Sequence, residues 1–340
     1  MKITVLSGGV GGARFLRGLR AAAPAGSQIT AIVNVGDDMW LSGLRISPDL
    51  DSIMYTLAGV NDEERGWGRV GETSRVSDEL RAYDIGWPWF TLGDLDIGTH
   101  LARTSMLRDG LALSEATSRI AERWDLGVRL VPATDYEVET HVVTAEGTMH
   151  FQEWWTRHRA ALPAQAFLHQ GVESALPAPG VLAALADADV ILLAPSNPVV
   201  SIGPILAIPG VRDAVVAATA PVVGVSPIIA GEVVRGMADA CLTAIGVETS
   251  ASAVALHYGA ELLDGWLVDT VDVASVEQLS AVGIRAAAVP LWMRDPSSSA
   301  QVARDALALA TPPQHELPCS TWSESAFVSC GRTRASTLIG

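Results

Sequence analysis

The sequence predicts an α/β fold of the Rossmann-like kind, with a mostly parallel, doubly wound sheet and an inserted helical and β-hairpin region. Two observations predict the sheet. Short apolar runs without polar alternation, typical of buried parallel strands, recur along the chain, and Ala-rich helical segments separate them. The expected strands are 2–6, 29–35, 190–193, 222–225, 267–268 and 286–289, and the clearest expected helices are 13–23 and 181–186.

The middle of the chain predicts the insertion. Residues 137–144 alternate β-formers with polar residues, AEG makes a turn and 148–152 returns, which indicates a β-hairpin. Helices or connecting segments are expected at 111–124 and 171–176. We therefore expect one domain over 1–310, with the insertion at about 105–180, and a disordered tail at 311–340, where Pro, Ser and Thr dominate.

Composition excludes several classes of protein. With 23 basic and 38 acidic residues the formal charge is −15, which argues against a nucleic-acid binder. Three cysteines are too few for a disulfide framework or a zinc cluster, and the first residues show no signal peptide, so we expect a cytoplasmic protein. The uncharged stretches 190–211 and 214–231 are interrupted by prolines, so we expect no membrane span.

A glycine cluster, GGVGG, follows the first expected strand and opens the first helix. Its members are Gly8, Gly9, Gly11 and Gly12. Free backbone N–H groups at the positive end of a helix dipole bind anions, so the cluster predicts a phosphate or diphosphate site. It is neither a Walker motif nor a clean G-x-G-x-x-G. The alternative is that the glycines only let the helix pack closely on the sheet.

Four carboxylates follow the second expected strand. Asp37 and Asp38 lie in NVGDD at the carboxyl edge of the sheet, and Asp49 and Asp51 lie in PDLD, where Pro48 starts a helix. So many acids near a phosphate loop predict a hard cation, and carboxylates with few His or Cys residues select Mg²⁺. We predict Asp37 and Asp51 as ligands. For Asp38 and Asp49, helix capping and solvated loop charge are equally good explanations.

Two further groups of polar residues complete the candidate site. TLGDLDIGTHLAR contains His100, a candidate acid or base, and Arg103, a candidate phosphate partner or ordinary ion-pair residue. The segment LAPSNPVVSIGPIL places Ser196 and Asn197 after another strand, and SPIIAG adds Ser226. The SNP of the first segment is short enough to be a simple turn. The position of both segments predicts the second half of a nucleotide site, with Asn34 on the first half.

The motifs SGGVGGARF, NVGDD, SPDLDSIMYTLAG, TLGDLDIGTHLAR, LAPSNPVVSIGPIL and SPIIAG, in this order, resemble the CofD/FbiA family. These are the 2-phospho-L-lactate transferases, and their phosphoenolpyruvate-using relatives, of deazaflavin coenzyme F-420 biosynthesis. The resemblance covers nearly everything from residue 1 to about 310. Six ordered motifs are far more specific than any one of them.

The resemblance implies the reaction. The 5′-hydroxyl of the deazaflavin precursor Fo (7,8-didemethyl-8-hydroxy-5-deazariboflavin) attacks a phosphorus of a guanosine-diphosphate-activated three-carbon acid, and GMP leaves. Phosphoenolpyruvate is the expected acid and phospholactate the alternative. The resemblance also implies an Mg²⁺-dependent transferase of substituted phosphate groups, a Rossmann-like core and a homodimer. By motif, Asp51 and Thr91 match Fo-binding positions, although similar archaeal members often carry Lys where this chain has Thr91.

The residues suit this chemistry. Transfer at a diphosphate phosphorus needs charge neutralisation and alignment more than covalent help, so we expect Asp37 and Asp51 to be catalytic. Four tryptophans, Trp40, Trp67, Trp87 and Trp89, are candidates to stack on Fo or to serve as core. Two other functions remain as alternatives: a non-catalytic nucleotide-sugar-binding regulator of the related gluconeogenesis-factor type, and an NAD-dependent dehydrogenase with Asp37 on the ribose.

Overall fold

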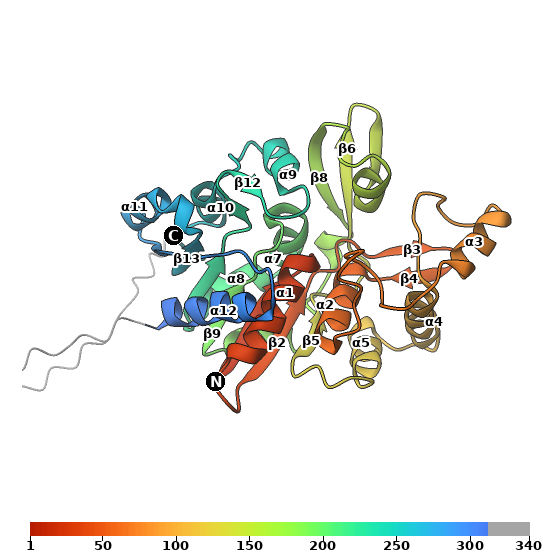
Figure 1. The fold of residues 1–340 in the computed structure, drawn as a ribbon, viewed down its shortest axis with the longest axis horizontal. Coiled ribbons are helices and arrows are strands. Elements are labelled where there is room, and N and C mark those ends of the chain that lie inside the picture. The colour runs from red at the N-terminus through yellow and green to blue at the C-terminus, as the bar shows by residue number, and fades with distance from the viewer. Residues whose placement is uncertain (312–340) are drawn as a thin grey trace, which may run out of the picture.

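The computed structural model describes residues 1–311, so the predicted tail lies almost wholly outside the described residues. Seven strands form one parallel sheet in the order β14-β13-β10-β9-β1-β2-β5 (Figure 1). They are β1 Lys2–Ser7, β2 Gln28–Val33, β5 Arg129–Pro132, β9 Val190–Leu193, β10 Val222–Val225, β13 Gly265–Val268 and β14 Arg285–Ala288. The chain runs outward from β1 through β2 to β5, then returns beside β1 and runs outward the other way. The doubly wound fold is therefore confirmed, with its switch point between β1 and β9.

Helices cover both faces of the sheet, because successive strand residues point to opposite sides. Val5 belongs to one hydrophobic cluster and Leu6 to the other. On the Val5 side α1 (Gly9–Ala22) packs against α2 (Pro48–Ala58) and α12 (Pro296–Ala310), with α5 (Leu113–Ala121) nearby. The other cluster includes residues of α6 (Val181–Ala186), α7 (Gly203–Ala207), α8 (Val211–Ala217), α9 (Ala238–Ala244), α10 (Ala251–Tyr258) and α11 (Ala274–Ala281).

The predicted elements are present with shifted ends. The expected strands 190–193 and 222–225 match the observed ones, and the ends of the other four differ by one or two residues. Helix α6 and the Pro48 start of α2 are as expected. The first helix begins at Gly9 rather than at residue 13. The glycine cluster is thus the first turn of α1 and not a loop before it. Three of its glycines have neighbours too close for a side chain, and this packing overrides the weak helix propensity of glycine.

The expected insertion at 105–180 is only partly separate from the main sheet. Its hairpin is present as β6 (Glu139–Thr144) and β7 (Gly147–His150), and β8 (Ala164–Gln170) adds a third antiparallel strand that we did not predict. Strand β5, however, lies within this range and belongs to the main sheet. Residues 111–124 contain α5, and 171–176 contain only a short 3₁₀ turn, Val172–Ser174.

A second excursion from the sheet follows β2, and the sequence did not reveal it. It contains the hairpin β3 (Met39–Leu41) and β4 (Leu44–Ile46), then α3 (Arg75–Ala82) and α4 (Asp94–Arg108), at the right of Figure 1. A small core of Met39, Leu41, Ile46 and Leu92 holds it together. Beyond β10, a short ribbon of β11 (Ile228–Ile229) and β12 (Glu232–Val233) projects from the sheet.

No single helix among residues 1–311 is long and apolar enough to cross a bilayer. One helical pair, Pro198–Ala207 with Val211–Ala217, passes on length and composition alone, and it is bent by 88°.

Candidate active site

The loops after β1 and β9 meet at the switch point of the sheet. Ser196 joins them, since its hydroxyl donates to the Gly8 carbonyl at 2.6 Å and accepts from the Gly8 amide at 3.1 Å. Open α/β sheets bind ligands in the crevice at this place. The predicted positions of Gly8 and Ser196 at one site are therefore realised in the fold.

The glycines of this turn have a packing role. A Cβ on Gly11 would lie 2.5 Å from the Pro195 carbonyl oxygen, and one on Gly12 would lie 2.9 Å from the Ser196 hydroxyl. A Cβ on Gly8 would lie 2.5 Å from Asp49 Oδ2. Close packing against Asp49, Pro195 and Ser196 therefore favours glycine at these three positions. Anion binding by the same turn stays a prediction.

Asp49 reaches the first turn of α1 from the neighbouring helix. Its carboxylate accepts a hydrogen bond from Asn34 Nδ2 at 2.9 Å and faces the Gly9 amide. Burial raises the pKa of Asp49 to about 6, against the lowering effect of Asn34 and the Gly9 amide. Asp49 is therefore no solvated loop charge. It supplies from within the protein the negative charge that the end of α1 attracts.

Asp37 and Asp38 are buried beside Asp49. Asp37 Oδ2 accepts a hydrogen bond from Gln152 Nε2 at 3.2 Å, whereas its Oδ1 has no partner among residues 1–311. Burial, then the charges of Asp49 and Asp38, raise the pKa of Asp37 well above its ordinary range. Asp38 accepts from the Ser47 hydroxyl at 2.7 Å, and burial raises its pKa to about 7. Asp38 is thus no helix cap.

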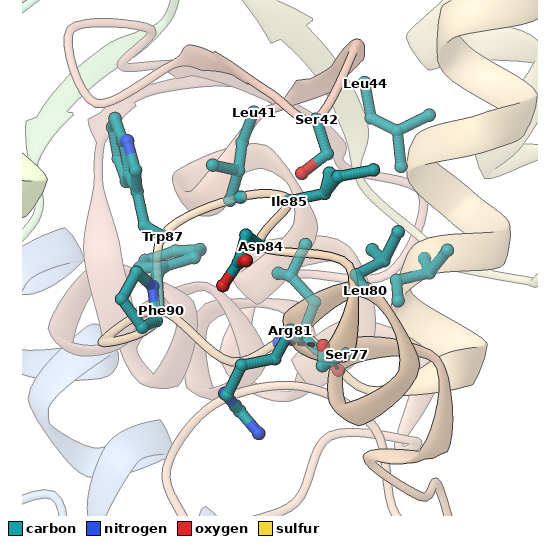
Figure 2. Close-up of a pocket in the computed structure, with 14 residues that line it drawn as sticks. Leu41, Ser42, Leu44, Ser77, Leu80, Arg81, Asp84, Ile85, Trp87 and Phe90 are labelled. Atoms are coloured by element: carbon teal, nitrogen blue, oxygen red, sulfur yellow. Dashed lines mark hydrogen bonds between the residues drawn. The ribbon is translucent and has the colours of Figure 1, made fainter.

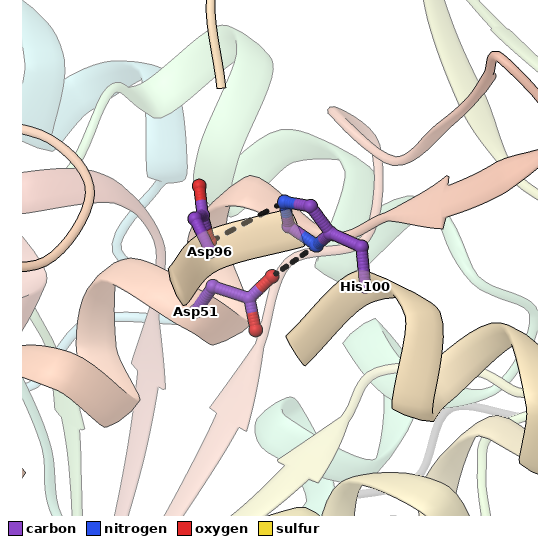
Figure 3. A group of neighbouring side chains, drawn as sticks. All are labelled: Asp51, Asp96 and His100. Carbon is purple, nitrogen blue, oxygen red and sulfur yellow. Dashed lines mark ion pairs between the residues drawn. The ribbon is translucent and has the colours of Figure 1, made fainter. Parts of the chain in front are cut away.

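Asp51 lies in a different ionic cluster. Arg103 donates to both of its oxygens, at 3.0 Å from Nη1 and closer from Nη2, and His100 Nδ1 lies 3.4 Å from Oδ2. Figure 3 shows His100 between Asp51 and Asp96, with its Nε2 3.3 Å from Asp96 Oδ1. Tyr55 donates to that same Asp96 oxygen at 2.8 Å.

The structure therefore does not bring Asp37 and Asp51 together as one ligand group. Asp51, Asp96 and His100 have ligand atoms within 4.8 Å of one another. They are the one such group of three or more acidic, His or Cys side chains among the residues described. Arg103 is fully buried and paired with Asp51, so it is neither a surface residue nor free to bind phosphate. Asp38 links the two clusters electrostatically, because the charges of Arg103 and Asp51 both affect its pKa.

A cavity of about 560 Å³ opens beside Asp51. This volume suits a small-molecule ligand. Asp51 and Thr91, the two positions that the family resemblance assigns to Fo, both line it, as do Asp96 and His100. The remaining wall includes the aromatic side chains Trp67, Trp89, Phe90 and Trp155.

The tryptophans differ in their positions. Trp67 and Trp89 line the 560 Å³ cavity. Trp87 instead lines a separate cavity of about 240 Å³ under α3, shown in Figure 2, and stacks on Trp89 at 4.6 Å between ring centroids. Trp40 lines neither, and its indole N–H donates to Glu137 at 2.9 Å. Trp67 and Trp89 thus remain candidates to stack on a planar ligand.

The side chains predicted after β9 and β10 are engaged locally. Asn197 Oδ1 accepts from the amides of Val199 and Val200 at 2.9 and 3.2 Å. The Ser226 hydroxyl exchanges two hydrogen bonds with the backbone of Ile228. Asn197 thus caps the helical turn Pro198–Ile202, rather than lying in a simple turn, and Ser226 stabilises the bend after β10. Their placement beside the switch point keeps nucleotide binding by these segments a prediction.

Sequence reasoning missed one wall of the cavity. Gln152, Trp155, Thr156 and Arg159 line it from a π-helical turn (Glu153–Arg157) and the bend that follows. Arg159 has a left-handed φ of 49°, which is uncommon for a side-chain-bearing residue. The signal in the sequence was the segment QEWWTRHR, which combines aromatic and polar residues directly after the predicted hairpin.

The chain is similar to known proteins over most of its length. The family model "2-phospho-L-lactate transferase CofD" matches residues 3–290. A phosphoenolpyruvate transferase of Streptomyces coelicolor is 57% identical to this chain, and the match covers 91% of this chain and 98% of that protein. A phosphoenolpyruvate transferase of Mycolicibacterium smegmatis is 51% identical, and the match covers 91% of this chain and 99% of that protein. A solved Bacillus halodurans protein of the upf0052 family is 19% identical, with a TM-score of 0.60 over 90% of this chain and 99% of that one, and supports the fold.

Proposed function

Because the chain belongs to the 2-phospho-L-lactate transferase CofD family, it is a transferase of coenzyme F-420 biosynthesis, and we propose that it joins Fo to phosphoenolpyruvate. The donor is the guanosine-diphosphate-activated acid and the product is dehydro-F-420-0. The names of the similar relatives support phosphoenolpyruvate over phospholactate. The comparisons give no support to the regulator or to the dehydrogenase.

The observation that carries the proposal is the 560 Å³ cavity. It brings Thr91 and Asp51, which are 40 positions apart in the chain, to one chamber with aromatic side chains in its wall. Planar deazaflavin suits aromatic side chains, and the carboxylate of Asp51 is available at the same chamber to a hydroxyl group of the ligand. The family resemblance assigns both residues to Fo, and both line the same cavity.

The reaction follows from this placement. The 5′-hydroxyl oxygen of Fo forms a bond to the phosphorus next to the three-carbon acid, and the bond from that phosphorus to the GMP oxygen breaks. The hydroxyl loses its proton and GMP leaves as the phosphate. We assign Asp51 the role of orienting or deprotonating that hydroxyl. Arg103 holds the Asp51 carboxylate in place through two hydrogen bonds, so Arg103 is a positioning residue.

A divalent cation fits the other acidic cluster. Asp37 has an oxygen without a partner among the described residues, and its carboxylate is buried near two other acids. Mg²⁺ uses one or two protein carboxylates, with water and substrate phosphate as its other ligands. We propose that Asp37 holds Mg²⁺, which when bound neutralises phosphate charge. Asp51, our second predicted ligand, fits less well because the Arg103 cation already occupies it.

The decisive experiment supplies purified enzyme with Fo, Mg²⁺ and each activated acid in turn, with mass spectrometry of the products. We expect dehydro-F-420-0 and stoichiometric GMP from the phosphoenolpyruvate form. Product only from the phospholactate form would refute the proposed acid, and absence of Fo-dependent GMP release would refute the reaction. We also propose, from the resemblance alone, a cytoplasmic homodimer, which sedimentation velocity tests for its oligomeric state.

A further inference from the structure

Three arginines gather beside the first turns of α1. Arg14 and Arg17 come from α1, and Arg235 comes from the segment after β12. Together they line a small cavity of about 20 Å³. Arg17 is ion-paired with Glu63. Within residues 1–311 neither Arg14 nor Arg235 forms an ion pair, and the contact of Arg235 with a hydrogen-bond acceptor is a long one, 3.5 Å to the Gly66 carbonyl.

The cluster has an excess of positive charge. It contains three guanidinium groups and one carboxylate, Glu63, in a chain whose formal charge is −15. Arg14 and Arg235 are close enough to repel each other, since the charge of Arg14, after burial, lowers the pKa of Arg235. In a chain rich in acids, two neighbouring arginines without carboxylate partners indicate a place where an anion completes the charge balance.

The small cavity adjoins the proposed Fo chamber. Ser52, Trp67 and Gly68 line both. Ser52 follows Asp51 directly in α2, so the arginine cluster lies along the wall that also carries the proposed catalytic carboxylate. A volume of about 20 Å³ is little more than one water molecule needs, so the cavity excludes a nucleoside and has room for a single oxyanion oxygen that reaches the arginines.

We propose that Arg14 and Arg235 form a subsite for a phosphoryl oxyanion of the activated donor, and this inference rests on the proposed function. Guanidinium groups bind phosphate oxygens through paired N–H donors, and two of them match a dianion. Two parts of the donor carry this chemistry: the phosphate that leaves with guanosine, and the phosphate of the three-carbon acid. Both arginines act in binding.

Calorimetric titration with GMP and, separately, with free phosphoenolpyruvate distinguishes the two sources. The proteins compared are wild type, Arg14→Gln, Arg235→Gln and the control Arg304→Gln, whose guanidinium is exposed on α12 and bonded to Gln301. We expect Kd for one of the two ligands to rise threefold or more in both subsite variants, with the control unchanged. The ligand affected identifies the phosphate. If both variants bind both ligands within threefold of the control, the subsite is refuted.

Kinetics separate this inference from the proposed function. In the reaction with the activated donor, we expect the subsite variants to raise KM for the donor and to leave KM for Fo unchanged, with partial recovery in Arg235→Lys. Circular dichroism checks that each variant is folded. Wild type that binds GMP but releases none in the presence of Fo would refute the function and leave the subsite standing. Normal donor KM in both variants would refute the subsite alone.

Discussion

Asp38 makes the stability of the free protein depend on pH in a direction that can be calculated. Its side chain is fully buried, with Ser47 Oγ at 2.7 Å and Arg45 Nη2 at 3.7 Å. Burial raises its pKa from 3.8 to about 7 despite Arg45. The folded protein therefore holds a proton that the unfolded chain has released, and this favours folding at low pH. The contribution is lost as the pH rises from the unfolded value through the folded one.

The size of the effect follows from the shift. A rise in pKa from 3.8 to about 7 corresponds to a total on the order of 4 kcal/mol. Of this, about 2 kcal/mol falls between pH 5.5 and pH 8, a window that avoids precipitation near the isoelectric point of about 4.8. Asp38→Asn removes the titration. We therefore expect the free energy of unfolding of the variant, minus that of wild type, to increase by about 2 kcal/mol from pH 5.5 to pH 8.

The assay is urea unfolding followed by tryptophan fluorescence, in EDTA, at four pH values across this window. The difference between the two proteins at each pH cancels the titration of the groups that they share, and the change of this difference with pH removes any constant packing cost of the substitution. Asp109→Asn, at an exposed position after α4, is the matched control and should show no trend. Parallel curves for wild type and Asp38→Asn would show that Asp38 is ionised throughout, and the burial argument would be wrong.

Three further predictions concern the site and its support. Asp51→Asn should lower turnover by about 10²-fold or more while Fo still binds, and wild-type turnover with Mg²⁺ saturating would remove Asp51 from the mechanism. Gly12→Ala should lower the free energy of unfolding by about 1 to 3 kcal/mol, because the new Cβ meets two serine hydroxyls. Gly98→Ala, at a position in α4 that is open to solvent, should raise it by up to about 1 kcal/mol. Equal effects of the two substitutions in urea unfolding would contradict the packing argument. Trp89→Phe should weaken Fo binding in a fluorescence titration by about threefold or more, and Trp40→Phe should not; equal affinities would exclude stacking on Trp89.

The sheet could be predicted because each of its central strands is a continuous apolar run. Strand β5 was not predicted, because Arg129–Pro132 begins with a charged residue and ends in proline. The proline is tolerated because β5 is an edge strand. The β3–β4 hairpin escaped as well. Its strands are three residues each, too short for a periodic signal, and they are held by a four-residue core drawn partly from Leu92.

The candidate site was predictable in its members but not in its pairings. Polar residues after strands identified Asp37 and Asp51 as site candidates, and both are buried, whereas the burial of Asp49 was not predicted. The partner of each carboxylate is a side chain from a distant segment, and sequence spacing does not predict which one it is. Arg103 pairs with Asp51 from another helix, and Gln152 reaches Asp37 from beyond the β6–β7 hairpin.

Asp49 at the first amides of α1 is an internal stand-in for the very anion that such a helix end attracts. A phosphate that approaches Gly9 meets a competitor already in place, tethered to α2 and therefore present at high effective concentration. The incoming group gains the amide only if the resident carboxylate takes up a proton or a metal ion, or swings aside. Occupancy of this end of α1 is consequently tied to the ionisation of Asp49, which shares the first turn of α2 with Asp51.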